Sequence, residues 1–514
     1  MAHFASARTA LLAGVASLTL AACGAEDIAS PGEGNLVVLP PAPAPTPTPT
    51  TPTPTPGTPA ASCPTGTVDS GTIQVSTSDT RRNCQISGTI RGALRLQNFA
   101  GTIYSLSGKV QVGDDRGPDV NNPVAGAQAG TLTIDAGVTI FGASGADFLV
   151  VNRGSQLNVD GSASRPVVMT SRSNVVGSVT GESIGEWGGL VILGRAPIGD
   201  CADAGATGGT NACQAPVEGT AGSIYGGANP SDSSGSIRYL QVRYPGFRVD
   251  TNNELNGITL AGVGSGTIFE YVQVHNSSDD GIEWFGGRVN QRYLVLTGND
   301  DDSLDMDSGW KGAIQFAIVT QRAGGADKLI EGDSTDKPVD ATPRTNLLLS
   351  NFTFVTPRAS SPIHLRGGMD GTLVNGVVRA TGTTGQCLDI DTAATVQAAN
   401  ATIDELGPLR FNSVLLNCAT AFVNDSDVDA AAVASLFGGG TNNSSTTAST
   451  LTATFINGSA ETAVTPFNPT SLSAFFSNVA YIGAVRDAND NWWRGWTCGL
   501  AADQASCTAI NAAG

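Results

Sequence analysis

One repeat constrains the fold of this chain more than any other feature. The segment Asp279–Phe285 is answered 22 residues later by Asp301–Asp307, and Tyr271 and Tyr293 keep the same spacing upstream. Apolar and polar residues alternate within each copy, as they do along a β-strand. A strand-based repeat of this length is typical of one coil of a parallel β-helix. We therefore predict an all-β chain that folds as a parallel β-helix solenoid.

Composition agrees with a solenoid and excludes one class of ligand. The chain has 514 residues, of which 64 are glycine, and a formal net charge of −18. Frequent turns between short strands account for the high glycine content. An acidic chain is a poor partner for nucleic acid, which rewards basic surfaces. The charge instead favours solubility outside the cell and the binding of cations.

The N-terminal residues have the features of an export signal followed by a spacer. Residues 1–23 contain a basic residue and an apolar run, and the sequence Leu20–Gly24 at their end resembles a bacterial lipobox. Cys23 is then the acylated first residue of a lipoprotein, and the absence of Asp after it favours the outer membrane by resemblance to other lipoproteins. Residues 24–62 are rich in Pro and Thr, and the stretch Pro40–Pro59 predicts an extended tether of about 60 Å.

Eight further cysteines fall into neighbouring pairs along the chain. Pairing of neighbours would give four disulfides, which fits an oxidising compartment, although the sequence leaves the connectivity open. No metal–thiolate spacing is present. The pairs of neighbours are Cys63 with Cys84, Cys201 with Cys213, Cys387 with Cys418, and Cys498 with Cys507.

Residues 63–405 form the predicted β-helix, with no helical period between residues 63 and 235. A first strand recurs as Ile237–Val242, Phe269–Val274, Gln291–Leu296 and Ile314–Val319. A second strand follows it in each coil and yields three aligned columns, one inward and two outward. The inward column is Ile258, Ile282, Leu304, Ile330, Ile363 and Leu388. The first outward column is Thr259, Glu283, Asp305, Glu331, His364 and Asp389, and the second is Ala261, Phe285, Asp307, Asp333, Arg366 and Asp391.

Residues 406–514 are predicted to add C-terminal coils and a small cap that contains a disulfide. The segment Asp429–Phe437 predicts a short helix capped by Asp427 or Asp429. Trp492, Trp493 and Trp496 precede Cys498 and indicate a packed cap on the last coil. The functional alternative for these tryptophans is an aromatic platform for sugars.

Three motifs resemble those of a bacterial family of outer-membrane lipoproteins with a right-handed, pectin-lyase-like β-helix. They are Glu186–Leu190, Ser277–Gly287, and Tyr481–Ala484 together with Gly495–Thr497. The resemblance implies a β-helix at the cell surface or in the periplasm and carries no established activity. It also implies a partner such as an outer-membrane nutrient receptor or the type II secretion machinery.

The outward acidic columns have three interpretations. Carboxylates on adjacent coils lie about 4.8 Å apart and repel one another by roughly 3 kcal/mol at an effective dielectric of 20. They are solvated, or they bind Ca²⁺, which prefers hard oxygen ligands, or they pair with Arg288, Lys311 or Lys328. The candidate calcium ligands are Glu283, Asp300, Asp302, Asp305, Asp307, Glu331 and Asp333.

A catalytic interpretation uses the same face. Asp280 on one coil and Asp301–Asp302 on the next are similar to the carboxylates of polygalacturonase-type glycoside hydrolases. The His-Gly and Arg-Ile-Lys motifs of that family are missing, and Asp pairs also bond backbone at turns. His364 is a candidate acid or base, and Arg366 or Lys328 is the candidate base of a calcium-dependent lyase. The leading hypothesis is therefore a lipid-anchored surface protein that binds a glycan, Ca²⁺ or an outer-membrane partner, and the alternative is a polysaccharide hydrolase or lyase.

Overall fold

The computed structural model describes residues 57–249, 254–335, 340–360, 362–500 and 504–510. Cys23, the export signal and the tether up to residue 56 lie outside the described residues. The described chain belongs to one compact unit, Thr53–Gly514. No helix among these residues is long and apolar enough to cross a membrane.

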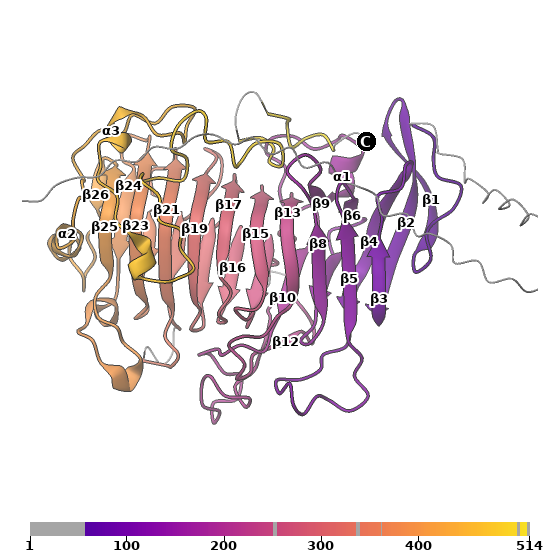
Figure 1. The fold of residues 1–514 in the computed structure, drawn as a ribbon, viewed down its shortest axis with the longest axis horizontal. Coiled ribbons are helices and arrows are strands. Elements are labelled where there is room, and N and C mark those ends of the chain that lie inside the picture. The colour runs from indigo at the N-terminus through magenta and orange to yellow at the C-terminus, as the bar shows by residue number, and fades with distance from the viewer. Residues whose placement is uncertain (1–56, 250–253, 336–339, 361, 501–503, 511–514) are drawn as a thin grey trace, which may run out of the picture. The chain divides into compact units, whose positions relative to one another are not determined.

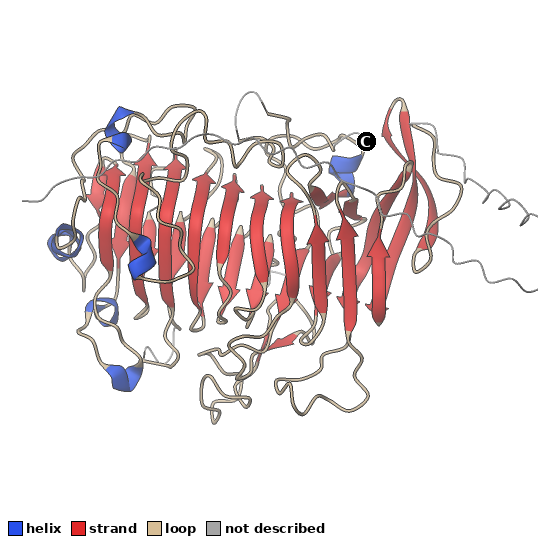
Figure 2. Ribbon diagram, in the orientation of Figure 1, coloured by secondary structure: helices blue, strands red, loops and turns tan. Residues whose placement is uncertain are grey.

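The compact unit is a parallel β-helix whose coils have three faces (Figures 1 and 2). In the early coils, separate short strands form the first and the second face. In the later coils, one longer strand forms both faces, one with each of its halves. For example, β13 pairs with β8 before Tyr239 and with β9 after it. These strands are β3 (Gly92–Leu96), β4 (Thr102–Val112), β5 (Gly130–Asp135), β6 (Thr139–Gly142), β8 (Gln156–Asp160), β9 (Val167–Ser171), β13 (Gly235–Arg243), β15 (Ile268–His275), β17 (Gln291–Thr297), β19 (Lys311–Thr320), β21 (Asn346–Thr356), β23 (Asp370–Ala380) and β25 (Arg410–Asn417).

The third face carries the predicted second strand of each coil. Its strands pair in parallel from one coil to the next, and β4 reaches it through its C-terminal half. They are β7 (Phe148–Val151), β10 (Gly189–Leu193), β14 (Ile258–Ala261), β16 (Ile282–Phe285), β18 (Leu304–Asp307), β20 (Ile330–Gly332), β22 (Ile363–Leu365), β24 (Gln386–Ile390) and β26 (Thr420–Phe422).

The predicted register of this face is confirmed. Ile258 pairs with Ile282 and Ile282 with Leu304, while Ile363 pairs with Ile330 and Leu388. All members of the inward column are buried in the central core. A single slip in register would turn this column outward, so core burial fixes the outward columns as well.

The corner between the first two faces explains the spacing of the tyrosines. Tyr239, Tyr271, Tyr293 and Phe316 each adopt a positive φ, between 55° and 63°, where the strand turns from one face to the next. Bulky residues seldom adopt this conformation. Their rings stack with successive centroid distances of 4.3, 4.3 and 4.9 Å, which holds them at the corner.

Different structures close the two ends of the solenoid. At the N-terminal end β1 (Val68–Ser76) and β2 (Asp79–Ile90) form an antiparallel pair. At the other end α2 (Ala430–Gly438), capped by Asp429, one of the two predicted caps, packs Phe437 on Phe411 and Phe422. The short helix α1 (Arg172–Val175) was not predicted, and it forms a single turn that Ser171 caps.

The C-terminal segment lies elsewhere than predicted. Residues 465–500 and 504–510, here called the C-terminal strap, run back along the corner from β25 to α1 (Figure 1). Trp496 packs edge-on against Tyr239 and Tyr271. The tryptophans therefore cover the side of the solenoid and not its last coil. Trp493 and Trp496 are buried and so cannot form an aromatic platform for sugars, whereas Trp492 is half-buried.

The structure contains the four disulfides that pairing of neighbouring cysteines predicts.

A few short elements lie in the loops and in the strap. The remaining elements are β11 (Ala215–Pro216), β12 (Ile224–Tyr225), η1 (Ala393–Val396), η2 (Ala401–Ile403), α3 (Ser459–Thr462) and η3 (Pro469–Ser471).

Candidate functional site

The third face carries the predicted acidic columns, here called the acidic face (β14, β16, β18, β20, β22 and β24). Glu283 pairs with Thr259 and Asp305, Asp305 with Glu331, and His364 with Glu331 and Asp389. The first outward column thus exists as predicted. The first coils of this column are covered, however, as the low exposure of Glu283, only 7%, shows.

A loop excursion covers this early part. Between β10 and β13 the chain leaves the solenoid, and the loop is closed by the Cys201–Cys213 disulfide and the β11–β12 pair. Its apolar residues pack on Ala261 and Phe285, which point outward from β14 and β16. The second outward column therefore begins as a small buried core and becomes polar only at Asp307.

Five carboxylates form a continuous cluster on the acidic face. Oxygens of Asp280, Glu283 and Asp305 lie within 4.8 Å of one another, and so do oxygens of Asp302, Asp305 and Glu331. Asp305 belongs to both groups and joins them. We call these five residues the carboxylate cluster. Asp279, Asp301 and Asp327 extend it along the adjoining turns.

Asp280 and Asp302 also connect successive coils. Oδ1 of Asp280 accepts a hydrogen bond from the backbone N–H of Asp302 at 3.0 Å. Oδ1 of Asp302 accepts one from the backbone N–H of Lys328 at 2.6 Å. The Asp side chains at these turns therefore accept hydrogen bonds from the backbone of the next coil. The sequence alone predicts hydrogen bonds to the backbone of their own turn. Part of the carboxylate cluster is thus part of the coil architecture.

The basic side chains lie at the edge of the cluster. Nδ1 of His364 is 3.4 Å from Glu331, and Arg366 is 3.2 Å from Glu331 and 3.4 Å from Asp333. Lys328 pairs with Asp327 and Lys311 with Asp404. Of the three cations expected to offset the acidic columns, none forms an ion pair with a column residue, although, against the effect of burial, the ion pair with Asp327 and then the charges of Asp302 and Glu331 raise the pKa of Lys328. In the described part of the chain no basic group forms an ion pair within 4.0 Å of Asp280, Glu283, Asp302 or Asp305, and Arg366 acts on Asp305 only from a greater distance.

Burial and mutual repulsion change the proton affinity of these acids. The pKa of each of Asp280, Glu283, Asp302, Asp305 and Asp307 is raised well above its ordinary value, chiefly by burial and then by neighbouring carboxylates. Glu331 is the exception, because His364, whose Nδ1 lies 3.4 Å from its Oε1, lowers its pKa to about 2. Ionised together, these acids would need a cation.

One residue of the site was not identified from the sequence. Asn256 occupies the position of Asp280 one coil earlier, and it is 3% exposed. Its Nδ2 donates to Glu283 and, at 3.3 Å, to Thr259, while its Oδ1 has no protein donor among the described residues. The coil alignment alone could have pointed to it, since Asn256-Gly257-Ile258 matches Asp280-Gly281-Ile282.

Other predicted residues lie apart from the cluster. Asp300 is paired with Arg322, which also binds Glu182. Asp307 faces Asp333 at the far side of the strands, where Asp333 is shared with Arg366. Two of the catalytic candidates, Asp280 and Asp302, are buried. Asp301 lies on the adjoining turn. His364 is separated from Asp302 by Glu331.

The sequence matches one known family of β-helix domains. No curated protein and no solved structure gives a significant match. A family profile described as a pectate-lyase-like beta helix domain matches residues 102–465. The match begins at β4 and includes every later strand of the solenoid and the whole carboxylate cluster. The chain therefore belongs to the family of pectate-lyase-like β-helix domains.

Proposed function

We propose that this protein is a lipid-anchored β-helix of the bacterial outer membrane that binds Ca²⁺ in the carboxylate cluster and a polysaccharide along the acidic face, without cleaving it. Family membership is compatible with a protein that binds or acts on polysaccharides. The lipobox-like sequence around Cys23 and the Pro/Thr-rich tether support an anchored protein held away from the membrane.

The observation that carries the calcium proposal is that four of the five clustered carboxylates have no ion-pair partner within 4.0 Å among the described residues. Asp280, Glu283, Asp302 and Asp305 converge, whereas the nearby basic groups pair with Glu331 and Asp327 at the edge of the cluster. Ca²⁺ takes roughly six to eight oxygen ligands, which carboxylates and an amide carbonyl such as Oδ1 of Asn256 can supply. A bound cation would replace the protons that these raised pKa values otherwise favour.

Calorimetry on the full chain tests this proposal. Protein stripped of metal by chelator is titrated with CaCl₂ at pH 7.5, and saturable binding is expected. Asp305→Asn removes the residue that joins both carboxylate groups and should weaken binding by about tenfold or more. Asp487→Asn, an exposed surface acid paired with Arg486, is the matched control and should bind as the wild type does. Absence of binding by the wild type would refute the calcium site.

Cleavage of a polysaccharide is the second candidate, and one observation favours it. Asp302 has a raised pKa and Glu331 a lowered one, although the two carboxylates are adjacent. Neighbouring acids with opposite shifts are the arrangement that acid–base catalysis needs. Incubation with acidic and neutral polysaccharides, with Ca²⁺ and with chelator, tests this. Release of reducing ends or unsaturated products by the wild type, lost in Asp302→Asn, would replace the non-enzymatic proposal.

A further inference from the structure

A small pocket lies on the first face of the solenoid, near its C-terminal end. Its volume is about 250 Å³, which suits a ligand smaller than the drug-sized molecules that occupy sites of roughly 300–1,000 Å³. Outward side chains of β21, β23 and the start of β25 form its floor. Leu406 from the loop before β25 and Leu472 from the strap form its walls. The pocket therefore lies on a different face from the carboxylate cluster.

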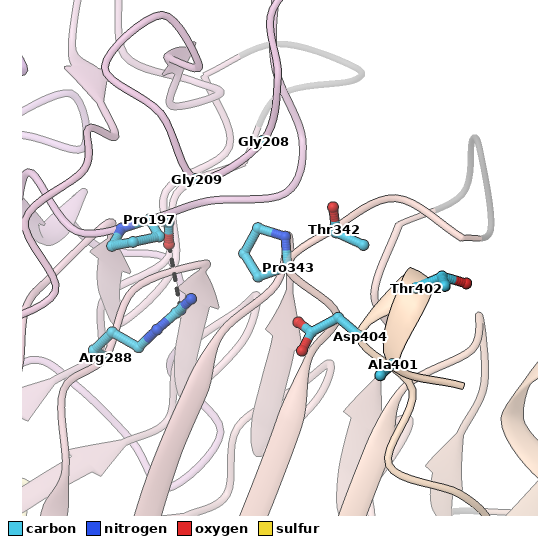
Figure 3. Close-up of a pocket in the computed structure, with 9 residues that line it drawn as sticks. All are labelled: Pro197, Gly208, Gly209, Arg288, Thr342, Pro343, Ala401, Thr402 and Asp404. Carbon is cyan, nitrogen blue, oxygen red and sulfur yellow. Dashed lines mark hydrogen bonds between the residues drawn. The ribbon is translucent and has the colours of Figure 1, made fainter. Parts of the chain in front are cut away.

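The loop between β24 and β25, which forms one wall, is anchored on both sides. Figure 3 shows its far side, where Asp404 lines a separate pocket across from Arg288. There Oδ2 of Asp404 lies 2.6 Å from Nζ of Lys311. On the near side, Oδ1 of Asp370 accepts a hydrogen bond from the backbone N–H of Leu406 at 3.0 Å. The wall that carries Leu406 is thus part of a preformed pocket.

The floor of the pocket contains a buried acid whose second oxygen has no ordinary donor. Asp370 is 1% exposed, and its Oδ2 accepts no hydrogen bond from an N–H or hydroxyl group of the described residues. Burial, followed by a hydrogen bond with the carboxyl group of Glu405, raises the pKa of Asp370 to about 7. Two carboxyl groups need a proton between them, and Glu405 already pairs with Nη2 of Arg344 at 2.7 Å. A cationic group of a ligand would replace this proton on Asp370.

Arg410 carries the opposite charge on the neighbouring strand. It is exposed, donates from Nη2 to the carbonyl of Leu406 at 3.2 Å, and forms no ion pair with a carboxylate of the described residues. Thr372 pairs with Arg410, so Asp370 and Arg410 are diagonal neighbours with Cα atoms about 7–8 Å apart. Leu348 pairs with Thr372 on the other side. The pocket therefore combines one acid, one base and apolar walls around a space of amino-acid size.

We propose that this pocket binds a free apolar α-amino acid, of about the size of leucine, as a zwitterion. The ammonium group contacts Asp370 and the carboxylate pairs with Arg410. The side chain packs on Leu348, Leu406 and Leu472. An amine or a carboxylic acid alone leaves one of the two charged groups without a partner, and a small or polar amino acid leaves the leucine walls in water.

Calorimetry on the full chain tests the site with ligands of matched shape, in chelator so that the calcium site has no part in the result. The ligands are leucine, isopentylamine, which lacks the carboxylate, 4-methylpentanoate, which lacks the ammonium group, and glycine, which lacks the side chain. Leucine should bind saturably, and the other three should bind at least about tenfold more weakly. The affinity for leucine should rise about tenfold from pH 6 to pH 8, because Asp370 must lose its proton.

Two pocket variants assign the contacts. Asp370→Asn, which can still donate to Glu405, should weaken leucine binding about tenfold or more and abolish its dependence on pH. Arg410→Gln should weaken leucine binding about tenfold and leave isopentylamine binding unchanged. Arg238→Gln removes the same charge from the exposed pair with Glu270 and should bind leucine as the wild type does.

The ligand series on the wild type decides the question even if a pocket variant does not fold. Absence of saturable leucine binding by the wild type overturns the site. Equal affinity for leucine and glycine overturns the apolar walls, and equal affinity for leucine and 4-methylpentanoate overturns the contact with Asp370. Leucine binding that is unchanged in both folded pocket variants places the ligand elsewhere and also overturns the proposal.

Discussion

The corner and the acidic face belong to the same coils, but their outward polar side chains have opposite kinds of partner. At the corner, outward amides are satisfied by main-chain groups of the C-terminal strap. On the acidic face, the carboxylates mostly meet other carboxylates. The corner contacts join Gln241 to Trp496, Gln273 to Cys498, Gln315 to Ser477, Asn351 to Tyr481 and Asn375 to Phe467.

This difference separates structure from candidate function. A buried amide is both donor and acceptor, so a strap of backbone can satisfy it fully. A buried carboxylate only accepts, and a second carboxylate cannot satisfy it without a proton or a cation. The corner therefore stabilises the solenoid, whereas the acidic face costs stability until something binds. Proteins accept such a cost at functional sites more often than elsewhere.

The largest effect should come from breaking the corner. Trp496 is fully buried, packs edge-on against Tyr239 and Tyr271, and donates from Nε1 to the carbonyl of Trp492. Trp496→Ala should lower the free energy of unfolding by about 3–5 kcal/mol, measured by urea denaturation. Leu406→Ala, at a side chain that is 50% exposed, is the control and should change little. An unchanged urea midpoint in Trp496→Ala would mean that the strap adds nothing to stability.

The acidic face should respond to pH and Ca²⁺ in a way the corner does not. Burial, followed by the nearby charge of Glu254, raises the pKa of Asp279 to about 7, and burial likewise raises that of Asp389 to about 7. The folded protein therefore binds more protons than the unfolded chain between about pH 4 and pH 7. In chelator, the melting temperature should fall as pH rises through this window.

Calcium should reverse that loss, because it binds the ionised carboxylates. At a free concentration of 100 times its dissociation constant it should add about 2.7 kcal/mol. The gain should be larger at pH 8 than at pH 5, since protons compete for the same oxygens. Scanning calorimetry with CaCl₂ or chelator at both pH values measures this. Melting temperatures that rise with pH in chelator would contradict the assignment of raised pKa values to this face.

A single amide tests the corner more finely. Gln273 donates to the carbonyl of Cys498 at 2.8 Å and accepts from its N–H at 2.9 Å. Gln273→Leu keeps the volume but leaves both backbone groups buried without partners, which should cost about 2 kcal/mol in urea denaturation. Gln273→Glu should be no better, because the acid cannot donate when ionised. A cost near zero would show that water replaces the amide.

The sequence predicted those features that depend on neighbouring coils. The 22-residue spacing defines the register of Glu283 and Asp305, and core burial allows only one face for their neighbours Ile282 and Leu304. The disulfides also follow from local spacing, since each closes a loop within one or two coils.

Features that join distant segments could not be predicted in this way. The strap contacts Gln241 across 255 residues, and no period records that pairing. The loop that the Cys201–Cys213 disulfide closes belongs to an excursion that packs on Phe285, and this position depends on tertiary packing. The same holds for Arg288, which the sequence offered as a partner for the acidic columns. It faces a different pocket because the turn after β16 directs it there.

The smallest expected effect is the most specific for the acidic face. Asp305→Asn removes one charge from the centre of the carboxylate cluster. In chelator at pH 8 it should stabilise the protein by about 1 kcal/mol, because it relieves repulsion from Glu331 and Asp333. With Ca²⁺ the sign should invert, since the variant forfeits the stabilisation that the wild type gains by binding. A substitution at an ordinary solvated acid would show neither the gain nor the inversion. If Asp305→Asn destabilises the protein equally with and without Ca²⁺, Asp305 supports the coil, as the aspartates of the turns do, and the acidic face loses its distinction from the corner.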